Sequence, residues 1–476
     1  MVTSRHRRDM FVGGTFQSTS TSEHLPVIDP ATEETVGSIA DSTEDDVSRA
    51  VAAARAALVD WRETSPQERA GYLRALADLF MERSEDIAAL VTLQNGSVIK
   101  RSRRTNGSRP VAVYRYNARL ADTLEVESEL GPDDPSLVRR EPVGVVGAIV
   151  PWNAPQSLLA AKLGPALAAG CTVVVKPSPE TSLDTFMLAE MLTAIGLPPG
   201  VVNVVTGGRE TGAAIVRHPD VDKVSFTGST AAGRVIASTC GEMLKSVTAE
   251  LGGKSAAVVL DDADLDVFAA NVISTCLPNT GQVCYSSTRI LAPRSRFTEV
   301  SDLVVETLGA AVVGDPKDPV SDFGPLVSEA QRQRVEGYIR SAIAEGAQVA
   351  LGGGRPSGLT TGYYVEPTVL VDVHREMRVF REEIFGPVVV VVPFDDDADA
   401  VRVANDSSYG LGGAVFSKDV ERATAVARRM ETGNVSVNGK DRSDATPSFG
   451  YKDSGVGGDP GLSGYLQLKG ISRSRD

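Results

Sequence analysis

The sequence has few of the residues from which metal sites and disulfide frameworks are built. Four cysteines and four histidines are scattered over 476 residues. No two cysteines form a Cys-x-x-Cys pair, and no two histidines stand three or four positions apart. Because zinc sites and disulfide frameworks need such spacings, we expect neither a metal nor disulfides.

The sequence also lacks an excess of positive charge and any long apolar run. Its formal net charge is −14, whereas nucleic-acid binding needs clustered positive charge. No apolar stretch reaches the length of a membrane span, and no apolar segment follows the basic residues 1–10. We therefore expect no nucleic-acid partner, no membrane partner and a cytoplasmic protein.

What is present is typical of a large folded chain. Hydrophobic residues make up 42% and charged residues 23%, which excludes a disordered chain. Short apolar runs at 144–150, 172–176, 201–205 and 223–226 alternate with segments of helical character. Strands that are apolar throughout and separated by helices indicate a parallel sheet, which binds ligands at the carboxyl ends of its strands.

Further helices and a hairpin are expected before this region. A helix is predicted over 44–61, and a second begins with Ser65 as its N-cap and ends at Gly96. Residues 97–123 are interpreted as more helix and 124–138 as an exposed hairpin. From the pattern alone, a solvated hairpin and an oligomerisation arm are equally good interpretations of the latter.

Two short motifs contain residues suited to covalent catalysis. Asn279-Thr-Gly-Gln-Val-Cys284 places a thiol after a glycine turn, and Ala249-Glu-Leu-Gly-Gly-Lys254 places a carboxylate at a strand end. A thiolate is a strong nucleophile, and a nearby carboxylate can activate water. Each motif alone is weak evidence, because a lone cysteine is most often buried and inert and Glu250 could simply pair with Lys254.

Together, in this order and at this spacing, the two motifs resemble those of the aldehyde dehydrogenase superfamily. The resemblance extends over nearly the whole chain through further motifs. These are Pro151-Trp-Asn153, Lys176-Pro-Ser-Pro-Glu-Thr181, Phe226-Thr-Gly-Ser229, Glu382-Glu-Ile-Phe-Gly-Pro387 and Tyr451-Lys-Asp-Ser-Gly455. The resemblance implies an α/β fold with a parallel Rossmann-like dinucleotide-binding domain, an α/β catalytic domain and a small β oligomerisation arm.

The resemblance also implies how the chain is divided and assembled. Residues 1–123 and 143–251 would form the dinucleotide-binding domain, and 252–450 the catalytic domain with the nucleophile. Residues 124–142 and 451–476 would form the oligomerisation arm and tail. A homodimer or homotetramer is expected from family habit.

The resemblance assigns three catalytic roles. Cys284 would attack an aldehyde and form a thiohemiacetal, hydride would pass to NAD(P), and Glu250 would assist hydrolysis of the thioester. The Asn153 side chain would donate to the oxyanion, together with the backbone N–H of Cys284. The residues that would bind the cofactor are Trp152, Lys176, Ser178, Gly228, Ser229, Gly233, Leu251, Glu383 and Phe385.

Three departures from the family pattern bear on specificity. Pro179 occupies the position where many NAD-preferring relatives carry a ribose-binding Glu, so repulsion of a 2′-phosphate is reduced. NAD is expected, and NADP is the alternative, since Arg209 could pair with its 2′-phosphate. The segments 447–450 and 457–459 also differ from the usual motifs, and the first of them tends to border the aldehyde entrance.

The residues beside the nucleophile predict the substrate class. Val283 and Tyr285 offer no charge to hold an acidic aldehyde, so a hydrophobic aliphatic or aromatic aldehyde is expected. One alternative is a CoA-acylating semialdehyde dehydrogenase, but retention of Glu250 favours water as the acyl acceptor. Another is a non-catalytic relative that keeps only the fold, which the retained Cys284, Glu250, Asn153 and Lys176 disfavour.

Overall fold

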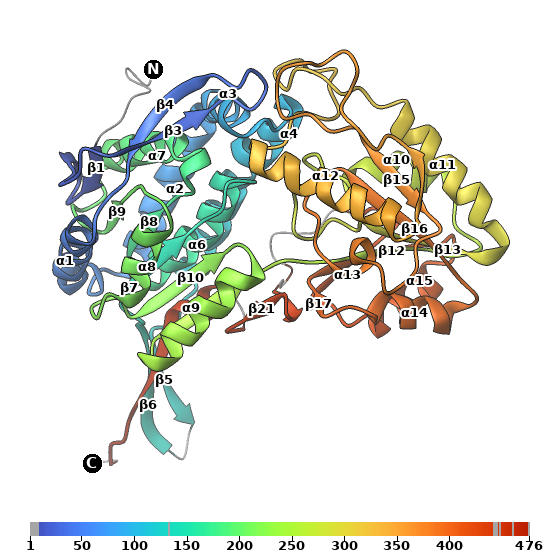
Figure 1. Ribbon diagram of the computed structural model, residues 1–476. Helices are drawn as coiled ribbons and strands as arrows, with labels where there is room; N and C mark the ends of the chain where they lie inside the picture. Colours follow the sequence, from blue (N-terminus) through green and yellow to red (C-terminus); the bar gives the residue numbers. More distant parts are fainter. Residues whose placement is uncertain (1–8, 132–133, 441–445, 447–448, 459–460, 475–476) are drawn as a thin grey trace.

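The computed structural model describes all residues except 1–8, 132–133, 441–445, 447–448, 459–460 and 475–476. Two α/β lobes lie side by side, and a narrow β arm extends away from the first of them (Figure 1).

The first lobe is built on an eight-stranded sheet in the order β2-β1-β9-β8-β7-β10-β11-β21. Its five central strands, β9, β8, β7, β10 and β11, run parallel. At the two ends of this group, β1 pairs with β9 and β21 pairs with β11, both antiparallel. The parallel sheet predicted from the apolar runs is thereby confirmed. The strands are β1 (Asp9–Val12), β2 (Thr15–Ser18), β7 (Val145–Ile149), β8 (Thr172–Lys176), β9 (Val202–Val204), β10 (Lys223–Thr227), β11 (Ser246–Glu250) and β21 (Gly455–Val456).

Helices cover both faces of this sheet because its strands are apolar on both sides. Val146 and Ala148 pack into one buried cluster, whereas Val145 and Ile149 on the same strand pack into another. The predicted start at Ser65 is confirmed, since its hydroxyl accepts the Glu68 N–H at 3.2 Å. The helices are α1 (Glu44–Trp61), α2 (Pro66–Glu82), α3 (Ser84–Asn95), α4 (Ile99–Ser102), α5 (Arg109–Asp122), α6 (Pro155–Ala169), α7 (Leu183–Ala194), α8 (Arg209–Arg217) and α9 (Thr230–Glu242), with a π-helical turn at Arg103–Ser108.

The second lobe is built on a seven-stranded sheet in the order β14-β15-β16-β13-β12-β18-β19, parallel except for the β14–β15 pair. Its strands are β12 (Ala256–Val259), β13 (Arg289–Pro293), β14 (Gln348–Leu351), β15 (Thr368–Val371), β16 (Val388–Phe394), β18 (Gly412–Phe416) and β19 (Asn434–Val437). Its helices are α10 (Leu265–Cys276), α11 (Phe297–Gly309), α12 (Glu329–Ala344), α13 (Arg378–Arg381), α14 (Asp397–Asn405) and α15 (Val420–Arg429).

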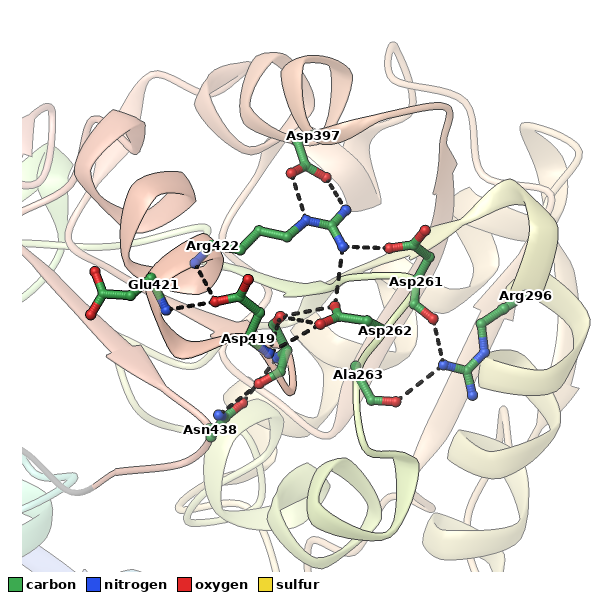
Figure 2. Close-up of polar contacts among 10 residues, drawn as sticks. Asp261, Asp262, Ala263, Arg296, Asp397, Asp419, Glu421, Arg422 and Asn438 are labelled. Carbon is green, nitrogen blue, oxygen red and sulfur yellow. Dashed lines mark hydrogen bonds and ion pairs between the residues drawn. The ribbon is translucent and has the colours of Figure 1, made fainter.

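One arginine ties together three segments of the second lobe (Figure 2). Arg422 on α15 donates two hydrogen bonds to Asp397 at the start of α14, at 2.9 and 2.6 Å. It also donates to Asp261 at 2.6 Å and to Asp262 at 3.2 Å, in the loop after β12. Paired bonds to a carboxylate fix the planar guanidinium, so this aspartate cluster holds α14, α15 and the loop in one arrangement.

The arm is a three-stranded sheet in the order β22-β6-β5. It consists of β5 (Glu127–Gly131), β6 (Asp134–Pro142) and β22 (Leu466–Ile471), and the antiparallel pairing of β5 with β6 confirms the predicted hairpin.

Short pieces complete the fold. The segment 451–476 pairs with three different sheets, through β17, β11 and β6, and the domain boundaries expected from the sequence stay a prediction. The remaining elements are β3 (His24–Ile28), β4 (Thr35–Ala40), β17 (Tyr409–Gly410), β20 (Tyr451–Lys452) and the 3₁₀ turns Pro179–Thr181, Arg294–Arg296 and Leu462–Tyr465.

Candidate active site

The carboxyl edge of the first sheet gathers the residues singled out in the sequence. β8 ends at Lys176 and β11 ends at Glu250, while Asn153 and Gly228 follow shortly after β7 and β10. These strands are neighbours in the order β8-β7-β10-β11, so the four residues lie along one edge. Lys176 and Glu250 are three strand spacings apart, about 14 Å by ordinary sheet geometry.

The loop that carries the nucleophile has an unusual backbone. Asn279, Thr280 and Gly281 are consecutive residues with positive φ angles, of 54°, 57° and 72°. At Gly281 a side chain is also excluded, because a Cβ atom would lie 2.0 Å from the carbonyl oxygen of Gly386. The glycine turn expected from the sequence therefore seats the Cys284 loop tightly on the second lobe.

Two hydrogen bonds fasten this loop to the first lobe. The Asn153 side-chain N–H donates to the carbonyl of Gln282 at 2.9 Å. In return, the Asn279 side-chain N–H donates to the carbonyl of Asn153 at 3.2 Å. Asn153 is thus held two residues from the nucleophile along the loop.

The Glu-Leu-Gly-Gly-Lys motif packs directly against the nucleophile. A Cβ atom on Gly253 would lie 2.2 Å from the carbonyl oxygen of Cys284, and one on Gly252 would lie 2.6 Å from Glu383 Oε2. The Gly253 N–H donates to Glu383 Oε1 at 3.0 Å. Both glycines are therefore needed for close approach, and three distant segments of sequence meet here.

Cys284 differs from the other three cysteines, all of which lie in the described part of the chain. Those three are buried, whereas Cys284 is partly exposed. Burial and the carboxylates of Glu383 and Glu250 raise the pKa of Cys284 to about 12, although its own N–H and that of Tyr285 oppose this. The thiol is therefore protonated at neutral pH.

Two aromatic side chains meet where the lobes join. The rings of Trp152 and Phe385 form an edge contact with centroids 5.4 Å apart and planes at 87°. The Gln331 side-chain N–H donates to the Phe385 carbonyl at 2.7 Å, which supports the positive φ of 63° at Phe385. Trp152 comes from the first lobe and Phe385 from the second, so both lobes supply walls of the site.

Helix α9 presents an uncompensated positive end at the same edge. Ser229 is its N-cap and accepts the Ala232 N–H at 3.3 Å, and its first turn contains no acidic residue. A Cβ atom on Gly233 would lie 2.3 Å from the Leu251 side chain, so this glycine lets α9 approach the Leu251 segment. A helix N-terminus of this kind suits an anion such as a pyrophosphate.

Lys176 and Ser178 form a separate cluster at the other end of the edge. The buried Lys176 ammonium donates to the carbonyls of Pro177 at 2.8 Å and Gly207 at 2.6 Å. Burial lowers the pKa of Lys176 to about 8, while Glu180 and Asp41 oppose the decrease. The Ser178 hydroxyl donates to the Glu180 carboxylate.

Comparison with known proteins decides the family. The model described as "Aldehyde dehydrogenase family" matches residues 16–471. The chain belongs to the aldehyde dehydrogenase family. The resemblance drawn from the motifs is confirmed, and as a member of this family the protein is an enzyme that oxidises an aldehyde to a carboxylic acid.

Individual relatives of the enzyme cover almost its whole length. A geranial dehydrogenase from Castellaniella defragrans is 46% identical over 97% of this chain and 98% of its own. A crystal structure of Mycobacterium tuberculosis aldehyde dehydrogenase complexed with NAD+ is 42% identical, with a TM-score of 0.96 and 99% of both chains covered. A mutant of aldehyde dehydrogenase C from Pseudomonas syringae, complexed with NAD+ and octanal, is 39% identical with a TM-score of 0.95, covering 98% of this chain and 96% of its own. These likenesses confirm the α/β fold with its Rossmann-like parallel sheet.

Sequence reasoning missed a buried polar chain beside Glu250. The Lys162 ammonium on α6 of the enzyme donates to the Ser225 hydroxyl at 3.3 Å, and the Tyr465 hydroxyl donates to the same oxygen at 3.0 Å. Burial lowers the pKa of Lys162 to about 8, and the charge of Glu250 opposes this. The available signal was that Lys162 is the one charged residue in the mostly apolar α6.

Some expectations for the enzyme fall on segments that the structure leaves undescribed. Residues 447–448 and Asp459, which carry the departures from the family motifs, lie outside the described residues. Within the described part of the chain, no group of three or more His, Cys, Asp or Glu side chains could hold a metal ion. Among the same residues, no helix is long and apolar enough to cross a membrane.

Proposed function

We propose that this enzyme oxidises a hydrophobic aldehyde through a thiohemiacetal on Cys284, with NAD as hydride acceptor and Glu250 assisting hydrolysis of the thioester. The observation that carries the proposal is the convergence of three segments by direct backbone packing. Gly253 lies against the Cys284 carbonyl and donates to Glu383, which ties the carboxylate segment, the nucleophile loop and the second lobe together.

The thiol of Cys284 must lose its proton before or during attack on the aldehyde. Glu250 is close enough for its charge to raise the pKa of the thiol, and after acylation it takes a proton from the attacking water. One N–H of the Asn153 amide is engaged by Gln282, and the other donates to the oxyanion together with the Cys284 N–H. The buried Lys162 near Glu250 helps to hold the negative charge of this base in place.

NAD is the cofactor that the site residues fit. Its nicotinamide ring accepts the hydride when bound. The positive end of α9, capped by Ser229 and without an acid in its first turn, binds the pyrophosphate. Lys176 and Ser178 bind the adenosine ribose, and Glu383 the nicotinamide ribose. The remaining cofactor contacts are made by Trp152, Gly228, Gly233, Leu251 and Phe385, and crystal structures of two relatives in complex with NAD+ support the assignment.

The substrate is a hydrophobic aldehyde. Val283 is buried and Tyr285 is 47% exposed, so the residues flanking Cys284 offer an apolar wall and an aromatic ring. Geranial dehydrogenase and the octanal complex are relatives whose names include apolar aldehydes. Other relatives are dehydrogenases of betaine aldehyde and of a pyridine semialdehyde, so the substrate preference needs a direct comparison.

The enzyme forms a homodimer or homotetramer and resides in the cytoplasm. Support for assembly comes from large apolar side chains that the single chain leaves exposed. Leu244, just after α9, is 94% exposed, Val235 on α9 is 67% exposed, and Leu468 on the arm strand β22 is 72% exposed. Such residues on neighbouring elements are typical of an interface between copies.

One spectrophotometric experiment tests the proposal. Purified enzyme is mixed with NAD and octanal, geranial, benzaldehyde, betaine aldehyde or succinic semialdehyde, and NADH formation is followed. We expect turnover of the first three, and loss of turnover in Cys284→Ala but retention in the matched control Cys240→Ala. Aldehyde-dependent NADH formation by Cys284→Ala would contradict the covalent mechanism, and preference for the last two aldehydes would contradict the substrate class.

A further inference from the structure

The corner at the end of β8 carries a carboxylate one residue later than the family pattern. Pro179 stands third after Lys176, and Glu180 follows it. Residues 179–181 form a 3₁₀ turn, which reverses the chain after the extended Ser178. The turn brings the Glu180 carboxylate back to the Ser178 hydroxyl, which donates to it.

This carboxylate lies in the surroundings of the Lys176 ammonium. The Lys176 ammonium has three N–H donors, and two of them donate to the carbonyls of Pro177 and Gly207 at 2.8 and 2.6 Å. A Cβ atom on Gly212 would lie 3.3 Å from Lys176 Cε, so α8 closes the corner from the other side. Of the charged groups that stabilise the ammonium, Glu180 contributes most and Asp41 next.

Asp41 adds a second fixed negative charge at this corner. Its Oδ1 accepts the Gly208 N–H at 2.9 Å, and the Thr211 hydroxyl, which donates to the Ser42 carbonyl at 2.8 Å, lies 3.4 Å from the same oxygen. A carboxylate therefore already occupies the N-terminal end of α8, where a phosphate would otherwise find N–H donors. The neighbouring Arg209 is exposed and is followed by Glu210, an acid in the same first turn.

We propose that Glu180, oriented by Ser178, replaces the carboxylate missing at Pro179 and makes this enzyme select NAD over NADP. Its carboxylate accepts a hydrogen bond from the ribose 2′-hydroxyl of NAD, and together with Asp41 it repels the 2′-phosphate of NADP. The inference rests on the proposed function, because it requires the adenosine ribose to lie beside Lys176. It replaces the sequence-based alternative in which Arg209 pairs with the 2′-phosphate.

Isothermal titration calorimetry on the enzyme without aldehyde measures the relevant affinities. The dissociation constants of NAD and of NADP are compared for the unsubstituted enzyme, for Glu180→Gln, and for Glu306→Gln, an exposed carboxylate on α11 of the second lobe, as a control. We expect Glu180→Gln to weaken NAD about tenfold and to tighten NADP about tenfold, as for the loss of one charged hydrogen bond and one repulsion. Glu306→Gln should leave the ratio of the two constants within about twofold.

The outcomes separate the inference from the proposed function. An unchanged ratio in Glu180→Gln, while NAD still binds the unsubstituted enzyme, overturns the role of Glu180. Failure of NAD to bind the unsubstituted enzyme overturns the proposed function instead. If Glu180→Gln unfolds, Ser178→Ala is measured, which frees the carboxylate without removing it. It should bring the dissociation constants of NAD and NADP about threefold closer together if the inference is right, because loss of the Ser178 hydroxyl itself weakens both cofactors alike, and an unchanged ratio overturns the inference.

Discussion

Burial and the negative charges of Glu383 and Glu250 make the surroundings of the Cys284 thiol unfavourable for a thiolate. With its pKa raised to about 12, the thiol is almost entirely protonated at neutral pH. The unreacted nucleophile is therefore largely in its inert form, because the thiolate and not the thiol reacts with electrophiles and oxidants. In this enzyme, reactivity arises only when the proton is removed in the course of catalysis.

This protonation state predicts how Cys284 reacts with iodoacetamide. Below the thiol pKa, each unit of pH increases the ionised fraction tenfold, so alkylation of the enzyme without cofactor should accelerate about tenfold per unit between pH 7 and pH 10. Mass spectrometry of the peptide that contains residue 284 measures the rate. A plateau below pH 9 would contradict the prediction.

The same measurement distinguishes two roles of Glu250. Because its negative charge raises the pKa of Cys284, Glu250→Gln should increase the alkylation rate at fixed pH by several-fold. If Glu250 instead removes the thiol proton in the resting enzyme, the rate in Glu250→Gln should fall. Glu210→Gln, an exposed carboxylate on α8, serves as the control and should leave the rate unchanged.

Motifs allowed Cys284, Glu250 and Asn153 to be identified as candidates, because each reactive group stands close to a glycine or a proline in a turn. Lys162 also stands close to a Gly-Pro pair, Gly164-Pro165, but it lies inside a segment of helical character, and its position beside Ser225 depends on how α6 packs against β10. Packing between elements far apart in the sequence leaves no local pattern to detect. The charge of Lys162 in an apolar helix was the only trace of it.

Elements with strong local signals were predicted well. The helix at 44–61 matches α1 residue for residue, since its apolar stripe and Thr43 cap are encoded locally. By contrast, β1 and β21 join the first sheet antiparallel through partners almost 200 residues away or more. Their pairing is set by the folded lobe, so two- and four-residue strands of this kind escape a pattern-based search.

The contacts of Arg422 with the surrounding aspartates should contribute measurably to the free energy of unfolding. Arg422→Ala leaves Asp261, Asp262 and Asp397 near one another without their shared cation, so the free energy of unfolding should fall by about 1–2 kcal/mol. The control is Arg294→Ala, which breaks an ion pair whose side chains are both 65% exposed and should therefore have a clearly smaller effect. Urea denaturation measures both, and equal losses would contradict a network effect.

At the scale of the whole molecule, the active site exists only because two lobes meet. Asn153 and Trp152 come from the first lobe, while Gln282 and Phe385 come from the second, and each contact spans the junction. A change in lobe orientation would separate Cys284, the proposed nucleophile, from Asn153, the proposed oxyanion donor. The site is therefore sensitive to how the lobes pack as well as to the residues themselves.

Assembly should depend on the exposed apolar side chains near α9 and on the arm. Leu244→Asp places a charge in the proposed interface and should shift the enzyme towards monomers by at least tenfold in dissociation constant. The matched control is Ile343→Asp, since Ile343 is also apolar and 52% exposed but lies on α12 in the second lobe. Sedimentation velocity distinguishes the species, and identical behaviour of the two variants would contradict the assignment of this surface.

The first sheet cannot be completed until β21 has been synthesised, late in translation. It closes the first sheet by pairing with β11, yet about 200 residues, including the entire second sheet, are synthesised between the two. At ordinary elongation rates of about 5–20 residues per second, the ribosome needs roughly 10–40 s to supply them. During that interval the nascent lobe exposes an unpaired edge at Glu250, so we expect chaperones to protect the catalytic edge until release.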